Sequence, residues 1–363
     1  MPTDARVVVC PAGPGPLQIQ DISLPDPGPY QVVVKQFASG ICHSQLHQMH
    51  GPRQAPTVLG HESTGVVIAA GREVSHVSEG DHVMVTWVPR DPNATRKPDP
   101  VSLQLDDGSI ARSQGVFTWA DTTIADEQFI VALPKDAPVD VTAIIGCAVM
   151  TGSGAVYHTA AVNEGESVAV YGVGGVGLSA IAAAAVVGAD PIIAVDLSEE
   201  KLRFAEKFGA TIGINASECD PVERIREITQ MPEGTTSFGA PAAGVDYAFD
   251  CIGIKTTMEQ ILPSVRPGML GHNTGGMAVL VGVPQTNVEI DARDLLPNEK
   301  KYIGSIGGSC RPERDFPMFL RWFNEGDLLL DDLVTERYTL DQINEATDAL
   351  TSGEISGRSI IEL

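Results

Sequence analysis

The spacing of apolar residues along this 363-residue chain changes near residue 155. Before that point, short apolar runs at 7–9, 32–34 and 65–68 are bounded by glycine and proline, which is typical of short β-strands joined by tight turns. We therefore expect the first part of the chain to form a small β-barrel or sandwich.

Beyond residue 155, apolar runs alternate with helix-like segments. The pattern predicts strands at 168–171, 191–196, 245–249 and 276–281, and helices at 178–187, 199–208, 316–324 and 340–350. Strands that alternate with helices form a parallel sheet with helices on both faces. This part of the chain is therefore expected to be a doubly wound α/β domain.

Residues 90–115 interrupt the β-rich region. They are polar, have turn signals at 91–93 and 97–100, and show little apolar periodicity. We interpret them as a surface lobe or long loop, because an unstructured connection of this length is usually functional or labile.

Length, charge and cysteine count narrow the class of protein. A chain of this length favours two domains, and its net charge of −23 argues against nucleic-acid or anionic-membrane partners, which need basic patches. We find no apolar run long enough to span a bilayer and no signal-peptide pattern at the start, so we expect a cytoplasmic protein. Its six scattered cysteines favour buried thiols or metal ligands over disulfides.

A glycine-rich turn follows the predicted strand at 168–171. Gly172, Gly174 and Gly177 have the G-x-G-x-x-G spacing at the opening of a predicted helix. The first glycine permits a tight turn, the second lets the backbone approach a pyrophosphate, and the third lets helix and strand pack closely. Because a helix N-terminus offers N–H groups to phosphates, we expect a dinucleotide site here.

Asp196 ends the next predicted strand, 19 positions after Gly177. A carboxylate there can accept hydrogen bonds from the ribose hydroxyls and repels the 2′-phosphate of NADP, and no arginine follows to offset the repulsion. We therefore expect NAD as the cofactor. The alternative is a helix cap for the segment that begins near Ser198.

Cys42, His61 and Cys147 are candidate zinc ligands. Two thiolates and one imidazole leave a tetrahedral zinc ion one open position for water or substrate. A Lewis acid beside a hydride carrier indicates oxidation of alcohols or reduction of carbonyls, because an alcohol at that position can lose its proton near neutral pH. Taken singly, each cysteine could be a small buried hydrophobe and the histidine a core residue.

The segments 40–44 (GICHS), 60–65 (GHESTG) and 146–152 (GCAVMTG), followed by the glycine turn, resemble the zinc-containing alcohol dehydrogenases of the medium-chain dehydrogenase/reductase superfamily. The resemblance runs over nearly the whole chain. It implies a β-rich, chaperonin-10-like catalytic domain from residues 1–149 and 306–363, with a Rossmann domain from 150–305 inserted between them. An active site in the cleft, and a homodimer or homotetramer, are also implied.

The resemblance also implies roles for single residues. The three candidate ligands would hold the catalytic zinc, with Glu62 behind the metal. Ser44 would take the substrate proton and His47 would pass it to solvent through the nicotinamide ribose. Alternatively, Ser44 bonds only backbone and His47 is a solvated surface residue.

Cofactor and substrate contacts follow from the same resemblance. The implied cofactor contacts are His43, Thr151, Gly172, Gly174, Gly175, Val176, Gly177, Asp196, Lys201, Val281 and Arg358. Of these, His43 and Arg358 would reach the pyrophosphate. Trp87 and Phe117 would line the substrate pocket. The simpler alternatives are a core aromatic for Trp87 and a helix-surface charge for Lys201.

Two departures from the family pattern change the expectations. Many relatives hold a second, structural zinc with four closely spaced cysteines, but residues 90–115 contain none, so we expect one zinc per chain. Relatives usually carry aspartate after the serine at position 44, where this chain has Gln45. We expect its amide to accept a hydrogen bond from His61 and to increase the basicity of that histidine less than a carboxylate would.

The resulting hypothesis is a zinc-dependent, NAD-linked alcohol dehydrogenase. A polyol dehydrogenase or a glutathione-type formaldehyde dehydrogenase is one alternative, although Trp87 and Phe117 favour an apolar or aromatic substrate. A non-catalytic dinucleotide-binding protein is another, and the intact ligand set argues against it.

Overall fold

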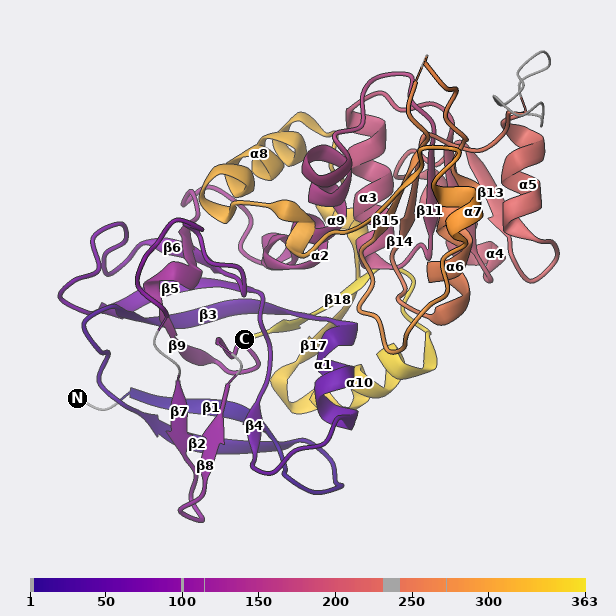
Figure 1. Ribbon diagram of the computed structural model, residues 1–363. Helices are drawn as coiled ribbons and strands as arrows, with labels where there is room; N and C mark the ends of the chain where they lie inside the picture. The colour runs from indigo at the N-terminus through magenta and orange to yellow at the C-terminus, as the bar shows by residue number, and fades with distance from the viewer. Residues whose placement is uncertain (1–2, 99–100, 114, 231–241, 272) are drawn as a thin grey trace. The chain divides into compact units, whose positions relative to one another are not determined.

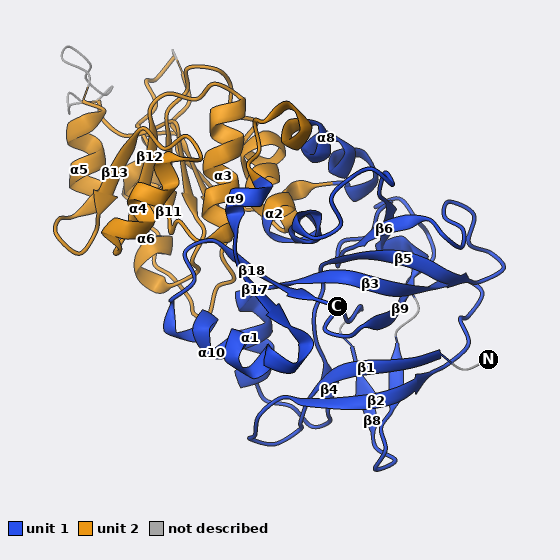
Figure 2. Cartoon of the chain, turned by 180° about the vertical axis from the view of Figure 1, so that it is seen from behind, with its two compact units in different colours: residues 1–148, 311–321, 330–363 blue, residues 149–310, 322–329 orange. Residues whose placement is uncertain are grey.

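The computed structural model describes residues 3–98, 101–113, 115–230, 242–271 and 273–363 (Figure 1). Its internal contacts divide the chain into two compact units, which Figure 2 colours separately. Unit 1 contains residues 1–148, 311–321 and 330–363, and unit 2 contains residues 149–310 and 322–329. The division expected from the sequence, at 149 and 305, did not include the short return of residues 322–329 to unit 2.

Unit 1 is rich in β-strands, as the sequence predicted. They are β1 (Thr3–Cys10), β2 (Gln18–Leu24), β3 (Gln31–Ile41), β4 (Thr57–Val58), β5 (Ser63–Ala70), β6 (His82–Val85), β7 (Ser102–Gln104), β8 (Ile110–Arg112), β9 (Thr122–Asp126), β10 (Ile130–Ala132), β17 (Val334–Thr339) and β18 (Arg358–Glu362). One sheet has the order β2-β1-β4-β8-β7 and the other β10-β6-β5-β3-β18-β17, with β9 also paired to β3. Since β18 pairs antiparallel with β3, the end of the chain completes a sheet that its first part begins.

Short helices connect these strands. They are α1 (His43–His50), η1 (Glu127–Phe129), η2 (Val141–Gly146), α9 (Leu330–Leu333), η5 (Leu340–Gln342) and α10 (Ile343–Ser352). Two further helices, α2 (Ala148–Gly154) and α8 (Pro312–Glu325), include residues of both units. The predicted helices at 316–324 and 340–350 correspond to α8 and to η5 with α10.

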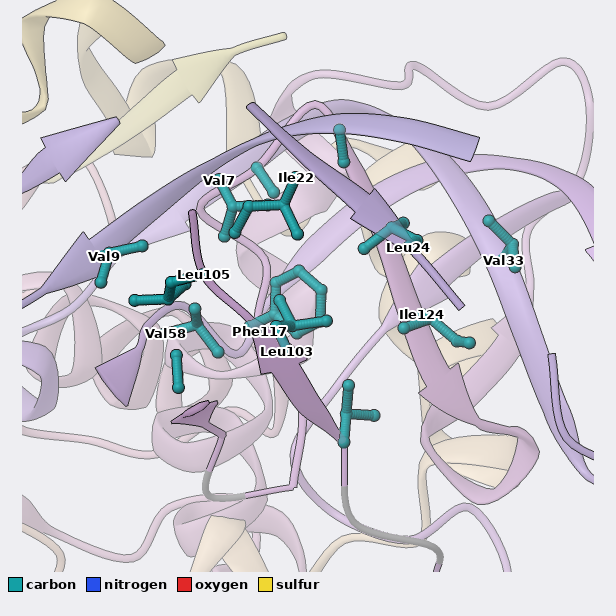
Figure 3. Packing of buried hydrophobic residues seen from close by; sticks show 14 residues of the cluster. Val7, Val9, Ile22, Leu24, Val33, Val58, Leu103, Leu105, Phe117 and Ile124 are labelled. Carbon is teal, nitrogen blue, oxygen red and sulfur yellow. The ribbon is translucent and has the colours of Figure 1, made fainter. Parts of the chain in front are cut away.

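Strand β1 shows how the sequence builds the core of unit 1. Successive side chains of a strand point to opposite faces, and Val7 and Val9 enter one apolar cluster while Val8 and Cys10 enter another. The first cluster also contains Ile22, Leu24, Leu103, Phe117 and Ile124 (Figure 3). Each of these buried side chains contributes about 1.5–3 kcal/mol to folding.

The interpretation of residues 90–115 as a surface lobe or long loop was wrong for its second half. There, β7 and β8 form an antiparallel hairpin, and β8 pairs with β4. The side chains of Val101, Leu103 and Leu105 alternate with polar residues and enter the core cluster of Figure 3. The alternation spans only residues 101–105, which is close to the shortest period-two run that predicts a strand.

The side chain of Arg96 anchors the first half of the same segment. Arg96 makes two hydrogen bonds of 2.7 Å to the buried carboxylate of Asp126, and its guanidinium lies 4.1 Å from the ring centroid of Tyr30. Nε2 of Gln128 donates to the carbonyl of Arg96 at 2.8 Å. Bidentate guanidinium–carboxylate contacts have a fixed geometry, so this cluster can hold a segment that carries no cysteine.

Unit 2 contains a six-stranded, all-parallel sheet with the order β13-β12-β11-β14-β15-β16. The strands are β11 (Val168–Tyr171), β12 (Ile192–Asp196), β13 (Ile212–Asn215), β14 (Tyr247–Asp250), β15 (Met277–Leu280) and β16 (Lys301–Gly304). The helices are η3 (Ala155–Ala160), α3 (Gly175–Val186), α4 (Glu199–Glu206), α5 (Pro221–Ile228), α6 (Lys255–Ser264), α7 (Ala292–Leu295) and η4 (Gly307–Ser309). This confirms the predicted Rossmann-like α/β fold.

Local signals explain where the elements of unit 2 begin and end. All four residues of β11 are buried, as expected for a central parallel strand covered on both faces. Helix α4 begins after Ser198, whose side chain accepts from the N–H of Lys201, and α5 begins after Asp220 with proline at its first position. The predicted strands at 168–171 and 191–196 and the helices that follow them correspond to β11, α3, β12 and α4.

Candidate active site

Three candidate metal ligands converge in unit 1. Cys42 directly follows β3 and is the N-cap residue of α1, His61 lies shortly before β5, and Cys147 directly follows η2. Their ligand atoms all lie within 4.8 Å of one another. The fold therefore assembles the trio from three separate elements.

The geometry of this trio fits a zinc ion. The Sγ atoms of Cys42 and Cys147 are 3.9 Å apart. Two thiolates at a Zn–S distance of about 2.3 Å in a tetrahedral site would be separated by about 3.8 Å. Nε2 of His61 is buried and has no hydrogen-bond partner among the described residues. Because buried polar atoms normally have a partner, this nitrogen is available to bind a metal ion.

The two thiols share a hydrogen bond. A hydrogen bond with Cys147 holds the pKa of Cys42 well below its usual range, and the same contact raises the pKa of Cys147. The guanidinium of Arg358 also favours the Cys42 thiolate. A divalent cation would replace the shared proton and favour both thiolates.

Glu62 and Arg358 form a buried ion pair beside the thiols. Nη2 of Arg358 donates to Oε1 of Glu62, and both side chains are almost completely buried. Burial raises the pKa of Glu62 to about 7, and the charge of Arg358 opposes this rise. Gly40 provides the space, because a Cβ there would lie 2.4 Å from Oε1 of Glu62. The pyrophosphate contact assigned to Arg358 stays a prediction.

Gln45 lies between two of the ligands. It is completely buried, its Oε1 accepts from the N–H of Cys42 at 2.8 Å, and its Nε2 hydrogen-bonds with Nδ1 of His61. We had expected the amide to accept from the imidazole, but its donor end faces the ring. The reason is that a backbone N–H can only donate, so Cys42 holds the amide oxygen on its own side.

Helix α1 carries the residues assigned to the proton relay. His43 and His47 are exposed, whereas Oγ of Ser44 is buried and lacks a hydrogen-bond partner in the described part of the chain. Arg53 holds the other end of the helix, since its guanidinium donates to carbonyls within residues 48–51 that the helix end leaves free. Ser44 is therefore presented on a short helix that is fixed at both ends.

The two aromatic residues assigned to the substrate pocket have different surroundings. The ring of Trp87 packs edge-on against the imidazole of His61, with 6.4 Å between the centroids. Phe117 has no exposed surface and packs among aliphatic side chains in the cluster of Figure 3. This gives Phe117 a packing role, and we retain only Trp87 as a pocket residue.

The glycine turn of unit 2 joins β11 to α3. Gly172 has φ +85°, a conformation that side chains disfavour, and a Cβ on Gly177 would lie 1.9 Å from the carbonyl oxygen of Gly172. A Cβ on Gly174 would have no neighbour within 4 Å among the described residues. The backbone at Gly174, Gly175 and Val176 is thus the open N-terminus of α3, where N–H groups can bind an anion.

Asp196 links the glycine turn to the next strand. Its carboxylate accepts from the N–H of Val173 at 3.0 Å and from the N–H of Ser198 at 3.1 Å. The side chain of Ser198 caps α4, so Asp196 is not needed for that purpose. Lys201 lies on the first turn of α4 and is partly buried.

The remaining cofactor candidates of unit 2 lie near strand or helix ends. Val281 directly follows β15 and is partly buried. Oγ1 of Thr151, on α2, is buried and unpartnered within the described ranges. Leu197, Ile252 and Ile254 were missed from the sequence. They are exposed apolar residues that follow β12 and β14, and the signal that could have found them is their position after the carboxyl ends of parallel strands, where nucleotides bind.

Two family models match this chain. Residues 28–135 match the family described as alcohol dehydrogenase GroES-like domain, and residues 175–325 match zinc-binding dehydrogenase. No helix formed by the described residues is long and apolar enough to span a membrane.

Individual relatives cover almost the whole chain. An alcohol dehydrogenase class-3 of Cereibacter sphaeroides is 33% identical over 95% of this chain and 96% of its own length. An S-(hydroxymethyl)glutathione dehydrogenase of Paracoccus denitrificans is 32% identical with the same coverage. The crystal structure of benzyl alcohol dehydrogenase from Acinetobacter calcoaceticus has a TM-score of 0.85 and 29% identity, and the match covers 99% of both chains. With its cysteine–histidine–cysteine trio and glycine turn, the chain belongs to the zinc-binding alcohol dehydrogenases of the medium-chain dehydrogenase/reductase superfamily, and it is an oxidoreductase that acts on CH–OH groups.

Proposed function

We propose that this enzyme oxidises an uncharged, apolar or aromatic alcohol with NAD, using one zinc ion per chain held by Cys42, His61 and Cys147. The observation that carries the proposal is the 3.9 Å separation of the two Sγ atoms beside a buried Nε2 that lacks a partner among the described residues. When bound, zinc supplies a Lewis acid for the substrate oxygen, and the nicotinamide ring supplies a hydride acceptor.

Ser44 and His47 move the substrate proton. Oγ of Ser44 has no hydrogen-bond partner within the described residues, so it can accept a bond from the substrate hydroxyl. His47 lies one helical turn further along α1 and is exposed, so it can release the proton to water. The exposed position of His47 and the buried hydroxyl of the partly buried Ser44 support a relay from inside to outside.

The Glu62–Arg358 ion pair keeps the charge beside the ligands balanced. Two thiolates already cancel the charge of a zinc dication, so an unpaired carboxylate nearby would weaken its pull on the substrate oxygen. Arg358 offsets that carboxylate through a buried contact. The pair thus preserves Lewis acidity without touching the substrate.

NAD would bind in unit 2 at the glycine turn, with its adenine ribose at Asp196 and Lys201. Asp196 favours NAD over NADP because a carboxylate repels the 2′-phosphate. Thr151 and Val281 would lie near the nicotinamide, and His43 and Arg358 would approach the pyrophosphate. Thr151 is the best supported of these candidates, because its hydroxyl is buried without a partner among the described residues.

An apolar or aromatic alcohol is favoured over a glutathione conjugate. The edge-on packing of Trp87 against His61 puts a large aromatic surface next to the metal ligand. A glutathione conjugate carries net negative charge, and a net charge of −23 on the chain disfavours its approach. The similarity to a benzyl alcohol dehydrogenase supports the same choice, whereas the similarity to an S-(hydroxymethyl)glutathione dehydrogenase makes the conjugate the first competitor to test.

The deciding experiment combines metal analysis with a substrate panel. Purified enzyme should contain one zinc per chain and should turn over benzyl alcohol with NAD faster than ethanol, a butanediol or S-(hydroxymethyl)glutathione. Two zinc ions per chain would overturn the single-site proposal. Active enzyme without zinc, or zinc-loaded protein that oxidises none of these alcohols, would overturn the catalytic proposal.

We also propose a cytoplasmic homodimer or homotetramer. β16 is an edge strand of the sheet of unit 2, and Leu296 and Ile306, which flank it in the sequence, are 81% and 79% exposed. Exposed edge strands and apolar side chains favour association. Light scattering coupled to gel filtration tests this, and a monomer at micromolar concentration would contradict it.

A further inference from the structure

Gln45 faces two groups with different hydrogen-bonding demands. On one side it accepts from the N–H of Cys42 at 2.8 Å, and on the other its Nε2 hydrogen-bonds with Nδ1 of His61. The side chain is completely buried, so water cannot replace either partner. An amide offers one acceptor and one donor end, and both are used here.

This arrangement determines where the imidazole proton lies. Because the amide nitrogen of Gln45 donates to Nδ1, a neutral His61 carries its proton on Nε2. Nε2 is the buried nitrogen that lacks a partner among the described residues and belongs to the trio. The tautomer that Gln45 favours is therefore the one in which the metal-binding nitrogen is protonated.

Metal binding demands the opposite tautomer. A neutral imidazole that binds a metal through Nε2 carries its proton on Nδ1, and that N–H must donate. It would then face the amide nitrogen of Gln45, which is also a donor. If the amide rotates, its oxygen serves His61, but its nitrogen then faces the N–H of Cys42. Either way, one buried donor loses a good acceptor, and such a loss is unfavourable.

We propose that Gln45 is a positioning residue that stabilises the metal-free tautomer of His61, so that zinc loading requires its amide to reorient and the site holds zinc less tightly than its ligands alone would allow. This rests on the proposed zinc site. A carboxylate in the same place would accept from both donors at once, which is why the single amide group matters.

The direction in which one substitution changes zinc affinity separates this proposal from an ordinary supporting role. Outer-shell partners that accept from a metal-bound histidine increase metal affinity, and their loss typically weakens it by about 10–100-fold. Gln45→Met removes the opposing donor with little change in size. We expect Gln45→Met to bind zinc as tightly as the wild type or up to about tenfold more tightly, and Gln45→Glu to bind about 10–100-fold more tightly.

Zinc affinity is measured by competition with a colorimetric chelator on the full-length protein, alongside thermal unfolding. Gln36→Met is the matched control, because Gln36 is also a buried glutamine of unit 1 and its amide donates to the carbonyls of Thr118 and Ala120. This control should lower thermal stability and leave zinc affinity unchanged. A loss of tenfold or more in Gln45→Met, without a loss in Gln36→Met, would overturn the proposal.

Nitrogen-15 NMR of histidine-labelled wild-type protein provides a second test that needs no variant in unit 1 to fold. Without metal, His61 should show a protonated Nε2, and addition of zinc should move the proton to Nδ1. A proton on Nδ1 both before and after zinc addition would overturn the proposal. Failure of the proposed function is distinguishable, because zinc would then not shift the His61 signals at all.

Discussion

The glycine turn of unit 2 and the metal trio of unit 1 differ in which part of the chain offers the binding groups. The turn uses six consecutive residues, 172–177, and offers backbone N–H groups at the start of α3. The trio uses side chains from three elements, and its neighbours Gln45 and Arg358 come from a helix and from the last strand of the chain. A backbone site fails when a side chain is added, whereas a side-chain site fails when a distant partner is removed.

The largest effect should follow from removing a metal ligand. Cys147→Ala takes away one thiolate of the trio, and because metal activation contributes several kcal/mol to catalysis, turnover should fall by about 10³-fold or more. The fold should survive, since cysteine and alanine are both small and the neighbouring residues 144–146 and 148–150 are buried and apolar. Steady-state kinetics, zinc content and thermal unfolding measure these three quantities.

Cys219→Ala is the control for that variant. Cys219 is exposed and belongs to unit 2, so its loss should change neither zinc content nor turnover. Equal turnover in Cys147→Ala and wild type would remove Cys147 from the catalytic site.

The next largest effect should come from Arg358, a residue outside the trio. Arg358→Leu leaves Glu62 buried without its cation, which costs about 3–5 kcal/mol when the carboxyl group is ionised. The folded pKa of Glu62 is already raised to about 7 by burial, and loss of the positive charge raises it further. A raised carboxyl pKa means that stability is present at low pH and is lost as pH rises through the folded pKa.

The destabilisation by Arg358→Leu should therefore be larger near pH 8 than near pH 5. Denaturant unfolding of wild type and variant at both pH values measures it. The double variant Glu62→Gln/Arg358→Leu should recover part of the loss near pH 8, because it removes the charge that Arg358 balances. A destabilisation that is independent of pH would mean that Arg358 acts through packing alone.

The same contrast explains what the sequence could predict. Strands β11 and β12 and the glycine turn are local features, so a run of apolar residues followed by spaced glycines was enough to predict them. The contact between Glu62 and Arg358 joins residues 296 positions apart, and no spacing rule indicates it. The ligands were recognisable only through the short segments around them.

Three misjudged details have physical reasons. The hairpin of β7 and β8 is a half-buried strand pair of three residues each, too short to give a clear period. Phe117 follows the ordinary tendency of aromatic residues to enter cores. The orientation of the Gln45 amide is set by the backbone N–H of Cys42, which becomes visible only when α1 is folded.

A smaller effect should follow from adding a side chain to the glycine turn. In Gly177→Ala, the new Cβ would lie 1.9 Å from the carbonyl oxygen of Gly172, so α3 must move away from β11. Overpacking of this kind costs about 1–3 kcal/mol. We expect the Kd for NADH to rise by at least about tenfold, measured by fluorescence titration, while zinc content stays at the wild-type level.

Gly174→Ala is the matched change, because its Cβ would have no neighbour within 4 Å in the described protein. It should leave stability unchanged and weaken NADH binding only through contact with the pyrophosphate. If Gly177→Ala bound NADH normally, close packing of helix and strand would not be what this turn requires.

The smallest effect concerns the choice between NAD and NADP. Asp196 accepts from the N–H groups of Val173 and Ser198, so its carboxylate both stiffens the turn and faces the site proposed for the adenine ribose. Asp196→Gly removes the ribose hydrogen bonds and the repulsion of a 2′-phosphate, so the preference for NAD in kcat/KM should narrow by about tenfold. Asp196→Asn tests the cause, because it removes the charge but keeps one side-chain oxygen, which can still accept from one of the two N–H groups. If charge determines the preference, Asn and Gly should narrow it alike. If only Gly narrows it, the turn geometry determines the preference, and a wild-type enzyme that favours NADP would remove Asp196 from the ribose site.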